Sequence, residues 1–283
     1  MRSSGREVRR LLRRSSRVRF TLLSLVVLLM LPCSWLLRTY VFEVVIVKDS
    51  GVSETLPRGS FAVFCKLEAC KERLEVGDLA LLKRPPDSRT IRKLLALPGD
   101  TLEIFAGGKA RAHGETFSLE GDKYIIADRQ LYLPREGDTL VLDSLSDIEL
   151  DFALNILRSE HVRFFMEAVP VSGGRDLPSE LAGNTKIAQR PVSLREIPGL
   201  PWQDLLLIAG QVKLLLHTND PVEFRRTVFN AQDSTKIETF TSPSGMYFFA
   251  CEKLDRCADS REFGYLPRSS ILGVNVFSFS RPR

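Results

Sequence analysis

The first 38 residues place a strongly basic segment directly before an apolar run, and this arrangement limits what the chain can fold into. Residues 1–19 contain eight Arg and one Glu, a charge of +7, while the whole 283-residue chain carries +5. The remainder therefore carries −2 and is nearly neutral. Residues 20–37 hold no charge over about the length a helix needs to cross a bilayer core. The pattern predicts a transmembrane anchor over residues 20–38 behind a basic arm.

Two other interpretations of the apolar run are a cleaved secretory signal and a lipoprotein signal acylated at Cys33. The run lacks a small-x-small cleavage site at its end, where Trp35, Leu36 and Leu37 stand instead. Lipoprotein signals usually place a small residue before the acylated cysteine, and here Pro32 precedes Cys33. The length and flanks of the run favour an uncleaved anchor.

The basic arm predicts the orientation of the chain in the membrane. Cationic residues resist crossing a bilayer and stay on the cytoplasmic side, so residues from about 41 onward should lie outside the cytoplasm. This is the topology of a single-pass protein of the inner (cytoplasmic) membrane, with the lipid bilayer as one partner. Nucleic-acid binding by the arm is not favoured, because no aromatic side chains are interleaved for base stacking.

The cysteines suit an oxidising compartment but leave their pairing open. Cys65 and Cys70 lie five residues apart, and Cys251 and Cys257 lie six apart. These spacings allow two local disulfides or four thiols. Neither spacing is the C-x-x-C of a zinc site, and the chain has three His. No metal and no cofactor are expected.

Short β-branched and apolar runs separated by Gly, Pro or Asp predict a mainly β fold. The predicted strands cover Val41–Lys48, Ser60–Lys66, Leu79–Lys83, Thr101–Phe105, Thr139–Leu142, Arg226–Asn230, Met246–Cys251 and Ile271–Phe279. Between them, apolar spacing predicts a helix within Ser144–Phe165 and another over Trp202–Leu216. Pro170–Gly199 reads as loop because it is rich in Pro, Gly, Ser and charged residues.

Three blocks of residues then resemble the signature motifs of a known family. Asp49–Leu56 is similar to S-G-S-M-x-P-T-L, chiefly at Thr55-Leu56, with Gly59 matching after it. The second block pairs Gly77–Leu81 with G-D-I-V-V and Ile91–Asp100 with I-K-R-x-V-G-L-P-G-D. The third block is Tyr247–Leu254, followed by Asp259-Ser260-Arg261 and Gly264–Pro267, with Ile271-x-Gly273 at its end. In this order, behind an anchor, the blocks resemble the bacterial type I signal peptidases (leader peptidases).

The resemblance implies a division of the chain and a fold class. Residues 1–19 would be the cytoplasmic arm and 20–38 the transmembrane helix. Residues 39–105 and 246–283 would form the family's β core, and 106–245 a less regular cap insertion. The expected class is mainly β, with a signal-peptidase-type β domain, a cap and one N-terminal transmembrane helix.

The family cleaves signal peptides with a Ser–Lys dyad, and the matching positions here hold different residues. Counting from the motifs, the nucleophile position falls on Gly51 and the base position on Arg92. Glycine has no side chain to attack with, and arginine keeps its proton at any accessible pH. Asp259, Ser260 and Arg261 match positions that support the dyad in the family. They also suit a turn held by an ion pair.

Two functions remain open on these residues. The first is a catalytically impaired relative that binds signal peptides or exported preproteins. The second is a working serine endopeptidase that uses Ser50 or Ser53 with Lys93, which requires a shift at both positions. Neighbours on a strand point to opposite faces, so Lys93 should aim away from the site of residue 92. A single-pass protein without any peptide groove is a third interpretation.

Overall fold

The computed structural model describes residues 28–48, 52, 56–84, 88–105, 109–112, 114–118, 129–251 and 258–279. The basic arm, the first part of the predicted anchor, and Ser50, Gly51, Ser53 and Cys257 lie outside the described residues.

A seven-stranded antiparallel sheet joins two distant parts of the sequence. Its strand order is β1-β2-β18-β3-β4-β16-β17, so strands from the end of the chain pair with strands from the first third. The strands are β1 (Phe42–Ile46), β2 (Phe61–Cys65), β3 (Leu79–Arg84), β4 (Ser88–Ala96), β16 (Met246–Ala250), β17 (Leu266–Pro267) and β18 (Ile271–Phe279). The mainly β class predicted from the sequence is confirmed in this part of the chain.

A second sheet of four strands follows β4 directly and has the order β7-β6-β5-β8. Its strands are β5 (Thr101–Phe105), β6 (Lys109–Ala112), β7 (Glu115–Ser118) and β8 (Arg129–Tyr132). Leu95 and Ala96 at the end of β4 pack in one buried cluster with Leu102 and Ile104 of β5. The same cluster takes in Phe152, so it ties both sheets to a helix.

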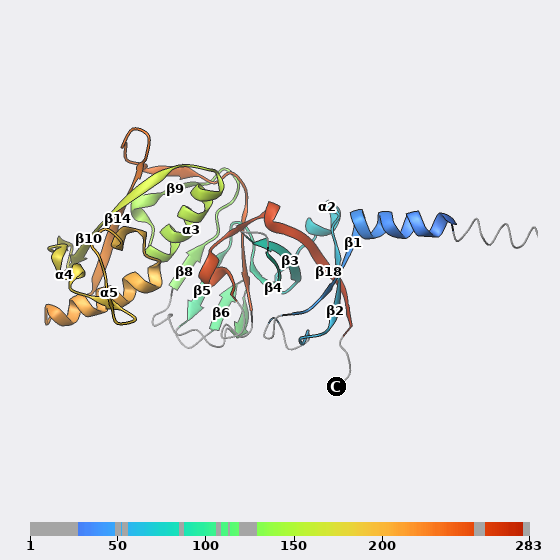
Figure 1. Cartoon of the computed structure of the whole chain (residues 1–283), viewed down its shortest axis with the longest axis horizontal. Helices are drawn as coiled ribbons and strands as arrows, with labels where there is room; N and C mark the ends of the chain where they lie inside the picture. Colours follow the sequence, from blue (N-terminus) through green and yellow to red (C-terminus); the bar gives the residue numbers. More distant parts are fainter. Residues whose placement is uncertain are drawn as a thin grey trace, which may run out of the picture.

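Beyond β8 the chain builds a mixed α/β unit at the end of the molecule away from the N-terminal helix (Figure 1). Its main sheet has the order β11-β10-β14. The longer elements are α3 (Asp147–Ser159), β10 (Phe164–Ser172), α5 (Trp202–Leu215) and β14 (Val222–Asn230). The shorter ones are β9 (Thr139–Val141), η2 (Leu142–Ser144), β11 (Arg175–Asp176), α4 (Glu180–Gly183), β12 (Lys186–Ile187), β13 (Arg190–Pro191), η3 (Ile197–Gly199) and β15 (Thr239–Thr241). We call the segment from β9 to β15 the cap; the boundaries 106–245 stay a prediction.

Both helices expected from apolar spacing are present, with one difference. α5 matches the predicted Trp202–Leu216 helix, while α3 ends at Ser159 and the residues after it form β10. A capping box at Ser146 and Glu149 starts α3. β10 pairs with β14 along all nine of its residues, and this long-range pairing decides the conformation of Phe164 and Phe165.

At the N-terminal end, residues 28–36 are helical and run through η1 (Leu37–Val41) straight into β1. Lys66 Nζ donates to the carbonyl oxygens of Arg38 and Thr39, in the turn where a helix leaves its last carbonyls without helical partners. Within the described ranges, none of the helices has the length and hydropathy required to cross a bilayer. The predicted anchor over 20–38 is therefore described in its second half only and stays a prediction.

We call the seven-stranded and four-stranded sheets together the β domain, and two further local features complete it. Cys65 and Cys70 form a disulfide with a Cα–Cα distance of 6.1 Å, which closes the turn into α2 (Glu68–Lys71). Cys251 is disulfide-bonded as well. The sequence left bridges and thiols as equal alternatives, and at these three cysteines the bridged alternative is the one found. The remaining short elements are α6 (Ser260–Phe263) and η5 (Arg268–Ser270).

Candidate functional site

Strand β4 places Arg92 and Lys93 on opposite faces of the seven-stranded sheet. Arg92 lies opposite Ala80 of β3, and Lys93 lies opposite Leu79 of β3 and Ala250 of β16. Successive side chains of a strand alternate between faces, so the two cations cannot serve one site from the same side. Their surroundings agree with this separation.

Arg92 is almost fully enclosed, at 2% exposed, and its guanidinium bonds to main-chain carbonyl groups. Nε donates to the oxygen of Ala258 at 2.7 Å, and Nη1 donates to the oxygen of Ile91 at 2.6 Å. Burying a charged group is costly unless such hydrogen bonds compensate for lost water. A guanidinium keeps its proton, so the group at this position holds the backbone together and cannot accept a proton from a nucleophile.

Lys93 is half-buried and points towards the four-stranded sheet. Its Nζ lies 5.6 Å from the centre of the Phe117 ring on β7, within the range of a cation–π contact. The expectation that Lys93 aims away from residue 92 therefore agrees with the strand geometry.

The face of β4 that carries Lys93 also receives the first motif block. Ile91 belongs to a buried cluster with Leu81, Val52 and Leu56. Val52 and Leu56 are 0% and 1% exposed, so they fix this motif against the sheet beside Ile91. Because Ile91 and Lys93 share a face, this packing is the feature of the structure most favourable to the alternative that uses Lys93.

Asp259, Ser260 and Arg261 form a buried brace between β16 and α6. The carboxylate of Asp259 accepts hydrogen bonds from the main-chain N–H of Cys251 at 2.8 Å and from Nη2 of Arg261 at 2.6 Å. Ser260 Oγ accepts from the N–H of Phe249 at 3.0 Å. All three residues are at most 3% exposed. Each therefore has a structural task that needs no substrate.

The brace and Arg92 meet at one short segment of main chain. Ala258, whose carbonyl accepts from Arg92, directly precedes Asp259. The structure thus brings the predicted base position and the predicted supporting residues together, and leaves Lys93 on the other face. The partner of Arg92 was missed from the sequence, because a main-chain carbonyl leaves no trace in a residue pattern.

Burial is the largest cause of the pKa shift at two of the ionisable groups, Tyr265 in the β domain and Asp147 in the cap. Burial raises the pKa of Tyr265 far above its usual range; its hydroxyl donates to the oxygen of Tyr132 at 2.8 Å, so it stays a neutral donor. Burial also raises the pKa of Asp147, while the neighbouring Arg226 works in the opposite direction. Among the residues that the structure describes, no His, Cys, Asp and Glu cluster suits a metal ion.

Residues 17–137 match the family described as signal peptidase, peptidase S26. This segment of the chain is similar to the signal peptidase family. The matched segment contains the first two motif blocks and ends before the cap helices, so Asp259–Arg261 lie beyond it. No curated protein sequence matches this chain. The position predicted for the family's base carries a buried arginine here, and the chemistry of that side chain limits what the position can do.

Proposed function

We propose that the protein is a membrane-anchored member of the signal peptidase family that binds the signal peptides of exported preproteins without cleaving them. The observation that supports this most strongly is the guanidinium of Arg92, enclosed and bonded to Ala258 and Ile91 where the family's dyad needs a neutral amine. A general base must give up its own proton before it can accept one, and arginine does not. Gly51 at the predicted nucleophile position is a second, independent reason to expect no catalysis, because glycine has no side chain that can attack a carbonyl group.

An exposed apolar surface on β1, β2 and β18 supports the membrane role in this proposal. Ile46, Phe61 and Phe279 lie opposite one another across the three strands, and all three are exposed. Phe277 on the next row is 61% exposed. Exposed apolar patches of this kind mark contact with membranes or partner proteins. The three strands lie at the end of the molecule where the N-terminal helix joins (Figure 1), so one bilayer can contact both.

The proposed orientation places the arm in the cytoplasm and the β domain and cap outside it. Protease added to spheroplasts, whose outer face is accessible, should digest the domain after residue 41. The same protease added to inverted inner-membrane vesicles should leave that domain intact. Protection in spheroplasts together with digestion in inverted vesicles would reverse the orientation.

A second candidate function has one specific observation in its favour. Lys93 shares a face of β4 with Ile91, and Ile91 packs against Val52 of the first motif block. An active serine endopeptidase would then use Ser50 or Ser53 with Lys93. It would have to move the ammonium from its contact with Phe117 and remove its proton.

The two functions separate in one assay of the purified full-length chain in detergent. A preprotein is incubated at high enzyme concentration with the wild type and with the Ser50→Ala, Ser53→Ala and Lys93→Ala variants. The proposal expects no cleavage by any of the four and saturable binding of a labelled signal peptide by all. Cleavage that one serine substitution abolishes would establish the second candidate instead.

A further inference from the structure

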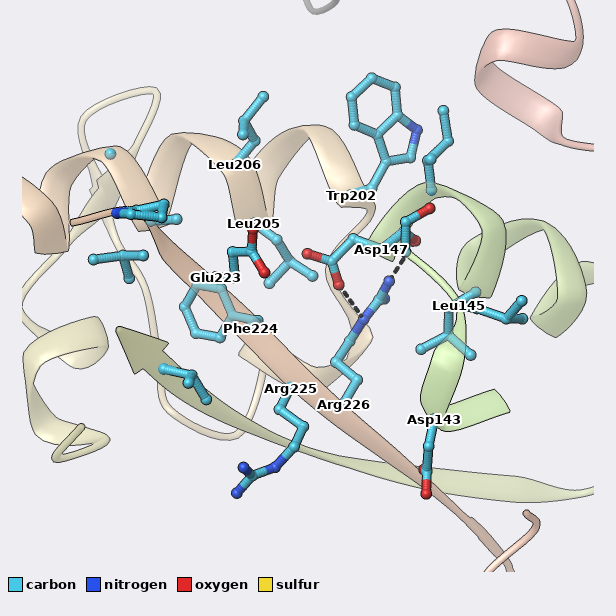
Figure 2. A pocket seen from close by; sticks show the side chains of 18 of the residues that line it. Asp143, Leu145, Asp147, Trp202, Leu205, Leu206, Glu223, Phe224, Arg225 and Arg226 are labelled. Carbon is cyan, nitrogen blue, oxygen red and sulfur yellow. Dashed lines mark hydrogen bonds and ion pairs between the residues drawn. The ribbon is translucent and has the colours of Figure 1, made fainter. Parts of the chain in front are cut away.

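The cap contains a cavity of about 810 Å³. None of the residues that line it lies in the three motif blocks. Most of its wall comes from α5, β14, and the segment from η2 into the start of α3 (Figure 2). Leu205, Leu206 and Phe224 give the walls an apolar character. A cavity of this size, largely apolar with a few polar groups, is typical of a binding site.

One edge of β14 faces this cavity without a neighbouring strand. β10 pairs with the other edge, and β14 is the last strand of its sheet. The carbonyl of Val228 accepts from the N–H of Ile237, and the N–H of Asn230 donates to Thr235, so the even-numbered residues turn their main chain away from β10. Val222, Phe224 and Arg226 follow the same alternation.

A second observation supports this direction at Phe224. Its partner on β10 is Pro170, which has no N–H, and the carbonyl of Pro170 accepts from Leu177 rather than from β14. The main-chain N–H and carbonyl of Phe224 are therefore not used in the sheet. Across the described ranges, no loop or turn bonds to the outward main-chain groups of Val222, Phe224 or Arg226. Such an edge can accept an added strand.

The charges around the cavity indicate what kind of strand would fit. Arg226 is bonded to Asp147 and Asp151, as the dashed lines in Figure 2 show in part. The other two paired charges on the walls are held by partners outside the cavity, Arg225 by Asp176 and Asp143 by Lys236. The two other charged residues on the walls are Glu223 and Lys213, whose charges have opposite signs. A segment without net charge meets no electrostatic penalty here.

We propose that this cavity, which we call the cap groove, binds an extended, uncharged, apolar segment of an exported polypeptide as an added strand on β14. The main-chain groups of Val222, Phe224 and Arg226 supply the hydrogen bonds, and the partly exposed side chains of Trp202 and Leu206 on α5 receive alternate side chains. The elements that wall the groove, α5 and β14, lie at the end of the molecule away from the N-terminal helix (Figure 1), so the occupant comes from the aqueous side. The choice of an exported chain rests on the proposed function.

Gly210 allows the groove to be blocked with little disturbance of the fold. It lies on α5, lines the groove, and a Cβ added there would have no atom within 4 Å. Gly210→Trp therefore places a large ring in open space inside the groove. Gly199 in η3 offers the matched control, since a Cβ there also meets nothing within 4 Å and Gly199 does not line the groove.

The test measures binding of a fluorescein-labelled, acetylated and amidated seven-residue peptide of alternating Val and Thr to the full-length protein. We expect saturable binding to the wild type and to Gly199→Trp, and affinity lowered by roughly tenfold or more in Gly210→Trp. A probe N-methylated at every second residue, on the side that faces β14, should also bind poorly, while methylation of the other set should be tolerated. Circular dichroism confirms that each variant is folded.

Equal binding to Gly210→Trp and wild type, or no binding to the folded wild type, would overturn the proposal. A dimer in light scattering that becomes a monomer on Gly210→Trp would overturn it too, by assigning the groove to a second copy of the chain. Binding of a labelled signal peptide is measured alongside and should be equal in both proteins. Its absence from both would count against the proposed function and leave the result on the groove unaffected.

Discussion

Three buried arginines show how differently the β domain and the cap use charge. In the β domain, Arg92 bonds to main-chain carbonyls, and Arg261 bonds to the carbonyl of Cys251 and to the buried carboxylate of Asp259. In the cap, the side chain of Arg226 is also fully buried, but its partner Asp147 is 32% exposed and lines the groove. The β domain thus uses its cations as internal crosslinks, while the cap places an ion pair beside a cavity.

This difference separates two activities, catalysis at the predicted base position in the β domain and binding in the cavity of the cap. At the predicted base position, Arg92 has a fixed structural role and cannot accept a proton. The cap has an accessible cavity and an open strand edge. Variants of paired charges, of the disulfide and of helix glycines test this difference between the β domain and the cap.

The largest loss of stability is expected for Arg261→Ala. Removing the arginine leaves the carboxylate of Asp259 buried without its cation, which costs about 3–5 kcal/mol. Arg225→Ala is the matched control in the cap, because its ion pair with Asp176 is more than half exposed and is worth about 1 kcal/mol or less. Urea unfolding of both variants measures the difference. Similar losses in the two would show that the contrast between β domain and cap is wrong.

A loss of about 2 kcal/mol is expected when Cys65 and Cys70 are both changed to Ala. The five-residue separation gives a small loop, and the chain-entropy estimate for closing it is of that size. Thermal unfolding with and without reductant checks it, since the reductant should lower the melting temperature of the wild type and have a smaller effect on the double variant. An equal response of the two proteins to the reductant would show that the Cys65–Cys70 disulfide does not stabilise the fold.

Asp147 in the cap should make the stability of the protein depend on pH. Its pKa is raised by burial, so the folded state binds a proton more readily than the unfolded chain does. Stability from this group is therefore greatest at low pH and falls as pH rises from its ordinary value of 3.8 through the raised one. Asp147→Asn should flatten the decline in melting temperature across that window. A steeper decline in the variant would contradict the sign.

The smallest effect is a gain of stability for Gly210→Ala. Alanine in a helix interior is favoured over glycine by about 0.5–1 kcal/mol, and the added methyl group meets no atom within 4 Å. Gly183→Ala in α4 is the control, because its Cβ would approach Leu194 to 3.0 Å and the crowding offsets any gain. Melting temperatures measure both. A gain at Gly183 with none at Gly210 would show that the groove side of α5 is not open.

The sequence predicted the β domain better than the cap, for a physical reason. Strands such as β3 and β4 carry local apolar patterns that predict them, and the motif around Leu97–Asp100 fixes the count back to Arg92. Whether Lys93 meets Phe117, and which carbonyl receives Arg92, depends on the packing of β4 against β7 and the segment before α6. Such contacts join residues far apart in the chain.

In the cap, local pattern was sufficient for α5 but not for the segment after α3. Phe164 and Phe165 continue the apolar spacing of a helix, and β14 overrides that preference by pairing with them about 65 residues later. The open edge of β14 has no sequence mark at all, since main-chain direction follows from the register. Pro170 opposite Phe224 is a trace visible in the sequence, and it has meaning only once the pairing is known.

Whether Gly51 and Arg92 are what prevents catalysis is tested by measuring cleavage of a preprotein by the full-length chain and by the Gly51→Ser, Arg92→Lys double variant. We predict no cleavage by the wild type or by either single variant, and a product in the folded double variant that a further Ser260→Ala substitution removes. Wild-type cleavage that disappears in Ser50→Ala or Lys93→Ala would contradict the account, because a proton would then be leaving a serine without help from position 92.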